Sequence, residues 1–143
     1  MLLNTNSDPR DHSTCALFYE EAEHWMKAVW RGYVNQAEAM RGAEAYLQYA
    51  VQYRCAYLLN DNSQLVGPWF ESLEWLLHAW VPQAERLGLR YVAHIVQADQ
   101  HHDIFTRQHH VPLPFELQIF QSAEDAYHWL ASVRDAELAK QAG

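Results

Sequence analysis

Two short and almost wholly apolar runs constrain this fold more than any other feature. They are residues 55–59 (CAYLL) and 90–97 (RYVAHIVQ), and each follows a segment whose apolar residues have helical spacing. A strand that is covered on both faces loses the alternation of apolar and polar side chains, and such strands occur mainly in parallel sheets flanked by helices. We therefore predict that the two runs are adjacent, central and buried strands of an α/β fold.

An antiparallel hairpin is predicted before these strands. Residues 14–20 are rich in β-forming side chains, and residues 25–33 alternate between apolar positions such as Met26 and polar positions such as Lys27. This period of two is typical of half-buried strands. The polar residues 1–13 are predicted to form a flexible arm in front of the domain.

Capping signals predict two helices between the strands. Asn35 and Glu38 have capping-box spacing, which predicts a helix that ends near residue 54. A second helix is predicted over residues 68–87, with Gly88 at its C-terminal stop. We expect a kink or a restart at Pro82, because proline cannot donate the helical hydrogen bond.

The last third of the chain predicts an edge strand and a final helix. Residues 115–119 alternate between apolar and polar side chains, and Ser122 and Asp125 repeat the capping-box spacing. Residues 99–110 are interpreted as a short helix or turn. The helix-prone residues 135–143 are interpreted as a C-terminal tail.

The predicted order is therefore β-β-α-β-α-β-(α)-β-α, a mixed sheet of about five strands with helices packed on it. Of the 143 residues, 50% are hydrophobic and 13% are aromatic. This is enough apolar material for one core, so we assign residues 14–134 to a single α/β domain.

Charge and cysteine content exclude several classes of protein. With 10 Lys and Arg against 18 Asp and Glu, the net charge is −8, whereas a nucleic-acid partner needs a basic surface. No stretch reaches the ~18 apolar residues of a membrane span. The two cysteines are too few for a secreted disulfide scaffold, so we expect a cytoplasmic protein.

Three groups of residues carry a family resemblance: LLNDN at 58–62 with VGPW at 66–69, WVP at 80–82 with GLRYVA at 88–93, and FQS at 120–122 with Ala126, Trp129 and Leu130. Together with the element order, they resemble the STAS-like fold of anti-sigma-factor antagonists over residues 14–134. The likeness is closer to small bacterial single-domain proteins described as STAS-like or CRAL-TRIO-like.

The resemblance implies a regulatory domain that acts through protein contacts or, from its CRAL-TRIO-like side, a carrier of small apolar ligands. The antagonists carry a phosphorylatable Ser or Thr at the start of the helix after the third strand. Here this helix opens with GPWF at residues 67–70, which offers no hydroxyl group. A phosphorylation switch is therefore not favoured.

Polar residues gather where the two central strands are expected to end. Asn60, Asp61 and Asn62 follow the first strand, and Asp99 follows the second. Ligands of open α/β sheets bind beyond the carboxyl ends of the strands, so these residues are candidates for a ligand or partner loop. The alternative is that Asn and Asp only turn the chain here.

Aromatic residues supply two further kinds of candidate. The helical period places Trp75 opposite the core stripe of the second helix and places Tyr49 and Tyr53 on the outer side of the first. These three are interface candidates, because exposed aromatics are enriched at protein interfaces, although single exposed aromatics are also normal. The candidates for an apolar pocket under the second helix are Trp69, Phe70 and Trp80.

Metal and catalytic signals are weak. Residues 101–110 contain His101, His102, His109 and His110, but no HExxH or CxxC spacing accompanies them. No GxSxG elbow and no GxxxxGK[ST] phosphate loop occurs. We therefore assign no metal, cofactor or catalytic residue, and we interpret His94 as a hydrogen-bonded core residue.

The sequence as a whole favours a non-enzymatic binding or regulatory domain that acts through protein–protein contacts, homodimer formation included. Two alternatives stay open: a protein that binds a small apolar, lipid-like ligand, and a metal-dependent enzyme that uses the His-rich loop. An aromatic-lined cavity under the second helix would favour the first alternative.

Overall fold

The computed structural model describes residues 1–10, 12–67, 69–70, 74–98 and 112–142. In chain order the elements are β1 (Leu2–Asp8), β2 (Ser13–Glu20), β3 (Trp25–Gly32), α1 (Gln36–Gln52), β4 (Tyr57–Leu65), η1 (Leu76–Trp80), α2 (Val81–Arg86), β5 (Tyr91–Ile95), β6 (Glu116–Phe120) and α4 (Ala123–Ala142).

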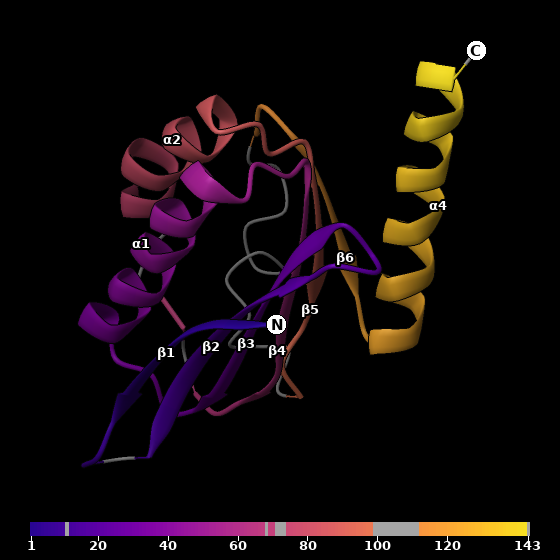
Figure 1. The fold of residues 1–143 in the computed structure, drawn as a ribbon. Coiled ribbons are helices and arrows are strands. Elements are labelled where there is room, and N and C mark those ends of the chain that lie inside the picture. Colours follow the sequence, from indigo (N-terminus) through magenta and orange to yellow (C-terminus); the bar gives the residue numbers. More distant parts are fainter. Residues whose placement is uncertain (11, 68, 71–73, 99–111, 143) are drawn as a thin grey trace.

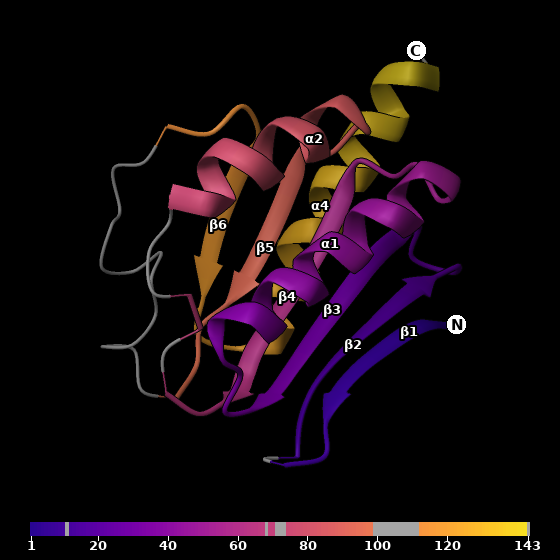
Figure 2. The ribbon, with the colours of Figure 1, turned by 90° about the vertical axis from the view of Figure 1, so that its left-hand side faces the viewer.

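The described strands form one mixed sheet in the order β1-β2-β3-β4-β5-β6. The first three pair antiparallel, and β3 to β6 pair parallel, so the strands follow one another across the sheet in chain order (Figure 2). The predicted α/β class, the hairpin and the central pair β4–β5 are confirmed. The sheet has six strands instead of about five.

Strand β1 shows that the prediction of a flexible arm over residues 1–13 is wrong. Leu2–Asp8 pairs antiparallel with β2, and the amino group of Met1 donates to the backbone oxygen of Tyr19 at 2.8 Å. Backbone hydrogen bonds attach an edge strand, and edge strands commonly carry polar side chains. A polar sequence can therefore join the sheet at its edge, although it lacks the apolar pattern of a core strand.

Strand β4 is longer than the sequence predicts. Asn60, Asp61 and Asn62 were expected to end the strand in a turn, yet they lie inside Tyr57–Leu65. The neighbouring strand β3 pairs along this extension as far as Gly32 opposite Leu65. This ladder satisfies the backbone groups of the polar residues, which then have no need to form a turn.

Helices cover both faces of the sheet. α1 and the η1–α2 segment lie on one face, and α4 lies on the other, against β4, β5 and β6 (Figure 1). Each face has its own hydrophobic cluster, with the larger one under α1, η1 and α2. The smaller cluster, under α4, includes Trp25, Leu59, Ile95 and Leu130.

The predicted N-caps Asn35 and Ser122 are confirmed. The amide N–H of Glu38 donates to Asn35 Oδ1 at 2.9 Å, and Asn35 Nδ2 donates to Glu38 Oε1 at 2.8 Å. At the start of α4, the amide of Asp125 donates to Ser122 Oγ at 3.1 Å. α4 then continues to Ala142, through most of the predicted tail. Among the described residues, no helix is both long and apolar enough to cross a membrane.

The second predicted helix begins later than expected, because Trp69 and Phe70 lie outside helical structure. A π-helical turn, η1, runs to Trp80, and its last turn has the Val81 N–H donating to the carbonyl of Leu76, five residues back. α2 restarts at Val81, beside Pro82, which has no N–H to continue the helical pattern. The hydrogen-bond pattern thus changes one residue before Pro82, where the sequence predicts a kink or a restart, while Trp80 and Val81 both keep a helical backbone.

The C-terminal stop of α2 also agrees with the prediction. Gly88 has a φ of 104°, a conformation that strains residues with a Cβ atom. Its amide donates to the carbonyl of Glu85 at 3.0 Å, and the amide of Leu89 donates to the carbonyl of Ala84 at 3.1 Å. These two bonds are the Schellman motif that ends many helices at a glycine.

Candidate ligand cavity

An apolar cavity of about 60 Å³ lies between the sheet and the layer of α1, η1 and α2. Of the described residues, leucines and valines from both layers contribute to its walls together with five large aromatic side chains: Trp30, Tyr46, Trp69, Trp80 and Phe115. This volume is the space open to the centre of a water molecule, and one water needs roughly 10–15 Å³ of it, so the cavity has room for about four to six waters. Since each water occupies about 30 Å³ in the liquid, the same space would hold one molecule near the size of benzene.

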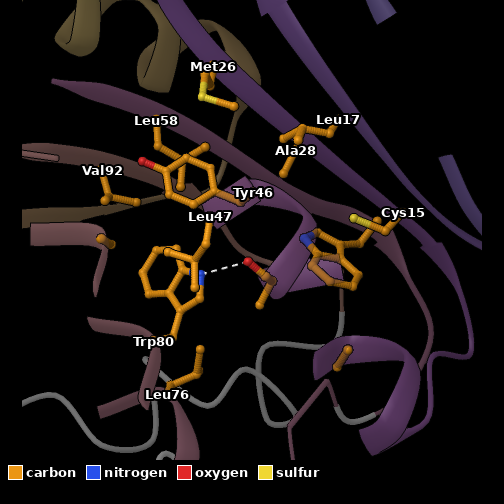
Figure 3. Close-up of a cluster of buried hydrophobic side chains, with 14 of the residues drawn as sticks. Cys15, Leu17, Met26, Ala28, Tyr46, Leu47, Leu58, Leu76, Trp80 and Val92 are labelled. Carbon is orange, nitrogen blue, oxygen red and sulfur yellow. Dashed lines mark hydrogen bonds between the residues drawn. The ribbon is translucent and has the colours of Figure 1, made fainter. Parts of the chain in front are cut away.

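The position of Trp80 is fixed by one hydrogen bond and two ring contacts. Its Nε1 donates to the carbonyl oxygen of Ala43 in α1 at 2.9 Å, the dashed line in Figure 3. Its ring centre lies 5.3 Å from that of Tyr46 and 6.4 Å from that of Phe115. Since the indole N–H is satisfied inside the core, this large ring keeps one orientation at the cavity wall.

Small residues on α1 and β3 make room for these rings. A Cβ atom at Gly42 would lie 2.4 Å from the ring of Trp30, so only glycine allows that indole to pack against α1. Ala43 and Ala28 also line the cavity. Because the methyl groups of these two alanines are short, they do not fill the space between the aromatic rings, and this space is the cavity.

A buried polar row borders the cavity, and we define it as Trp30, Asn60, Asn62 and His94. Trp30 Nε1 donates to Asn60 Oδ1 at 2.9 Å, while Asn60 Nδ2 donates to Asn62 Oδ1 and lies 3.1 Å from His94 Nδ1. This arrangement makes Nδ1 of His94 an acceptor, so its ring proton belongs on Nε2. His94 is 1% exposed, which confirms it as a hydrogen-bonded core residue.

None of the described residues that line the cavity has a charged side chain. Its described lining includes no Asp, Glu, Lys or Arg, and burial raises the pKa of the Tyr46 hydroxyl above its usual range. Behind the ring of Trp30, burial raises the pKa of the Cys15 thiol to about 12. Tyr46 and Cys15 therefore stay neutral at physiological pH, and the site suits an uncharged molecule.

The predicted ligand-loop residues are separated by the pleat of β4. Asn60 and Asn62 are buried on the cavity side, whereas Asp61 lies between them on the other face and accepts from the amide of Ser63 at 2.9 Å. Asp99 lies outside the described residues. The structure thus joins Asn60 and Asn62 in one polar row and does not place Asp61 in it.

The predicted pocket residues lie where the sequence put them, with one exception. Trp69 and Trp80 both line the cavity. Phe70 is 1% exposed and packs against Trp69 with ring centres 4.8 Å apart, but it is not part of the described lining. Sequence reasoning missed Trp30, Gly42 and Phe115. Two signals could have found the first two: Trp30 shares the apolar face of Met26 in the period-two pattern of residues 25–33, and a glycine inside a helical pattern often has a packing reason.

The three interface candidates are less exposed than expected. Trp75 is half-buried and stacks on Phe70 with ring centres 6.0 Å apart, so its predicted position opposite the core is wrong. The reason is that Phe70, which precedes the helix, packs its ring on that of Trp75. Tyr49 and Tyr53 are also half-buried against the core, and Tyr53 packs on Tyr19 with ring centres 4.9 Å apart.

A second polar cluster ties the β1–β2 turn to α1. Ser13 Oγ donates to Glu38 Oε2 at 2.6 Å, and Arg10 Nη2 lies 3.2 Å from Asp8 Oδ2. The hydrogen bond with Glu38 and the contacts with Arg10 keep the pKa of Asp8 well below its usual range. The same Glu38 caps α1 with Asn35, so this cluster explains how the edge strand is attached.

The His-rich segment, with His101, His102, His109 and His110, lies outside the described residues. Within the described part of the chain, no three His, Cys, Asp or Glu side chains converge as a metal site would require. Comparisons of this chain with models of protein families and with curated protein sequences find no match.

Proposed function

We propose that this protein binds a small, uncharged and largely apolar ligand in the cavity between the sheet and the α1–η1–α2 layer. The observation that carries the proposal is the cavity itself, walled by aromatic rings and bordered by the polar row. A STAS-like or CRAL-TRIO-like fold is part of the proposal, supported by the α/β class and by the strand–helix order from β2 to β5.

The energetics of packing support this proposal. Protein interiors are packed as densely as organic crystals, and few voids exceed the size of one water molecule. An empty apolar void costs roughly 24 cal/mol per Å³, so one of 60 Å³ would cost on the order of 1–2 kcal/mol. One larger side chain in place of Ala28 would fill much of this space. A ligand that occupies the cavity would regain the contacts that its walls lack.

A benzene titration of the purified protein tests the proposal. Benzene should shift the amide resonances of cavity residues and raise the melting temperature as its concentration rises, because a ligand that binds only the native state stabilises it. The Ala28→Val variant, which adds two carbon atoms inside the cavity, should bind benzene at least tenfold more weakly and remain folded.

Ala16→Val is the matched control, because Ala16 is also a strand residue but does not line the cavity. It should bind benzene as the parent does. If benzene and its hydroxylated analogue phenol both leave the resonances and the melting temperature of the parent unchanged, the proposal is wrong. Native mass spectrometry of the protein as purified would show in addition whether a small molecule is retained from the cell.

The other hypotheses stay predictions. Action through protein–protein contacts, homodimer formation, a cytoplasmic location and the lack of enzymatic activity rest on the sequence alone. The half-buried positions of Trp75, Tyr49 and Tyr53 give the contact hypothesis less support than the sequence suggested. The described cavity lining, by contrast, includes Trp69 and Trp80, two of the three residues that the ligand hypothesis named.

A further inference from the structure

We infer that the ligand carries an uncharged hydrogen-bonding group, a hydroxyl or an amide, which is bound by the amide of Asn62 beside the apolar cavity. This inference rests on the proposed function, that the cavity binds a ligand. It adds the chemical class of that ligand: a ring-sized apolar body with one polar head.

The first observation is an unused donor on Asn62. This side chain is 1% exposed, and its Oδ1 accepts the bond from Asn60 Nδ2 at 3.1 Å. In the part of the chain that the structure describes, no acceptor meets its Nδ2. Buried amide groups are nearly always hydrogen-bonded, since losing their water without replacement is unfavourable.

The second observation is an unused acceptor on Gln97, which is also 1% exposed. Its Nε2 donates to the carbonyl oxygen of Gly67 at 2.7 Å, while no donor from the described residues reaches its Oε1. Gln97 follows β5, whose Ile95 pairs with Asp61 of β4. Asn62, one residue beyond Asp61 in β4, therefore lies beside the carboxyl end of β5, and open α/β sheets bind ligands at this end of their parallel strands.

The polar row connects this end of the sheet to the cavity. Asn60 and His94 line the cavity, and Asn60 is bonded directly to Asn62. Asn62 is thus one hydrogen bond away from a molecule seated against Asn60 and His94. One free donor and one free acceptor match a group that both accepts and donates, as a hydroxyl or an amide does. The lining described here has no charged side chain to attract an ion.

Benzene and phenol are the probes, because they share a ring and differ by one hydroxyl. A dry apolar cavity favours benzene, since burying the hydroxyl of phenol without a partner is unfavourable. The parent protein should therefore reverse this order and bind phenol at least tenfold more tightly than benzene in NMR titrations. If benzene binds as tightly as phenol or more tightly, the polar-head inference is wrong, although the cavity is still a binding site.

Two variants locate the polar contact. Asn62→Leu should reduce the affinity for phenol at least tenfold and leave that for benzene within about twofold. Asn60 Nδ2 keeps its contact with His94 Nδ1 in this variant, so the polar row retains a partner. Gln97→Met is a second route to the same result if Asn62→Leu does not fold. A phenol preference that survives in the folded variants contradicts the inference.

Asp61→Asn is the matched control, because Asp61 is next to Asn62 but lies on the other face of β4. It should leave the affinities for both probes unchanged. Failure of both benzene and phenol to bind the parent would contradict the proposed function itself. That outcome is distinct from binding without a preference for phenol, which contradicts only the inference about the polar head.

Discussion

The two faces of the sheet are packed in different ways. Under α4, small residues let the helix lie close to the strands, and Ala93, Ala126 and Leu130 are all 0% exposed. Under α1, η1 and α2, large aromatic rings from separate elements meet and leave a cavity of about 60 Å³. Residues from both layers of the α4 face are thus fully buried, whereas the other face has space for an additional molecule.

Polar contacts are also placed differently on the two faces. At the rim of the α4 face, Arg134 Nη1 donates to Glu23 Oε2 at 2.8 Å, its guanidinium lies 5.4 Å from the ring centre of Trp25, and the hydroxyl of Tyr127 donates to Glu23. On the cavity face, the polar row and the Trp80 indole are bonded inside the core. The comparison indicates that internal hydrogen bonds fix the rings around a space that packing alone does not fill.

The largest expected difference comes from removing one leucine on each face. Leu130→Ala, under α4, should lower the free energy of unfolding by about 3–5 kcal/mol, because it opens a new void in close packing. Leu76→Ala, at the cavity, should cost about 2–3 kcal/mol, since Leu76 already lacks contacts on the cavity side. Urea denaturation of both variants measures this difference. A cost at Leu76 equal to or above that at Leu130 would contradict it.

Adding volume should have opposite results on the two faces. Ala93→Val, in the closed core under α4, should destabilise the protein by about 1–3 kcal/mol through overpacking. Ala28→Val should be neutral or stabilising by up to about 1 kcal/mol, because its methyl groups enter the cavity. Thermal and urea unfolding of the two variants provide the test, and equal destabilisation would show that the cavity face is as tightly packed as the other.

The smallest effect concerns pH and the rim of α4. The hydrogen bond from Tyr127 and the contact with Arg134 lower the pKa of Glu23 below the ordinary value of 4.5. A carboxylate with a lowered native pKa stabilises the fold above its ordinary pKa, and this stabilisation is lost as the pH falls through the lowered value. Partly exposed ion pairs contribute only about 0.2–1 kcal/mol.

Glu23→Gln should therefore be less stable than the parent near about pH 6, with a difference that shrinks as the pH falls towards about 3. Asp135→Asn is the control, because Asp135 contacts Arg134 from an exposed position, with its side chain 67% accessible. Urea unfolding at several pH values measures both. A pH-independent difference between the parent and Glu23→Gln would show that the carboxylate charge has no role at this rim.

Local patterns in the sequence determined most of the elements. The apolar runs of β4 and β5, the alternation in β3 and the caps at Asn35, Ser122 and Gly88 each act within a few residues of the chain. The sequence also named Trp69 and Trp80 as pocket residues, because their spacing placed them on the core side of the predicted helix. These features needed no knowledge of distant segments.

Other features were decided only by the tertiary structure. The polar β1 became a strand because β2 offers it backbone partners, and Asn60 and Asn62 stayed in β4 because β3 pairs with that strand as far as Leu65. Trp75 is half-buried because the ring of Phe70 stacks on it. The cavity arises where β3, α1, η1 and the segments that contain Trp69 and Phe115 bring their rings together. Its volume depends on distances between residues far apart in the chain, which no local pattern contains.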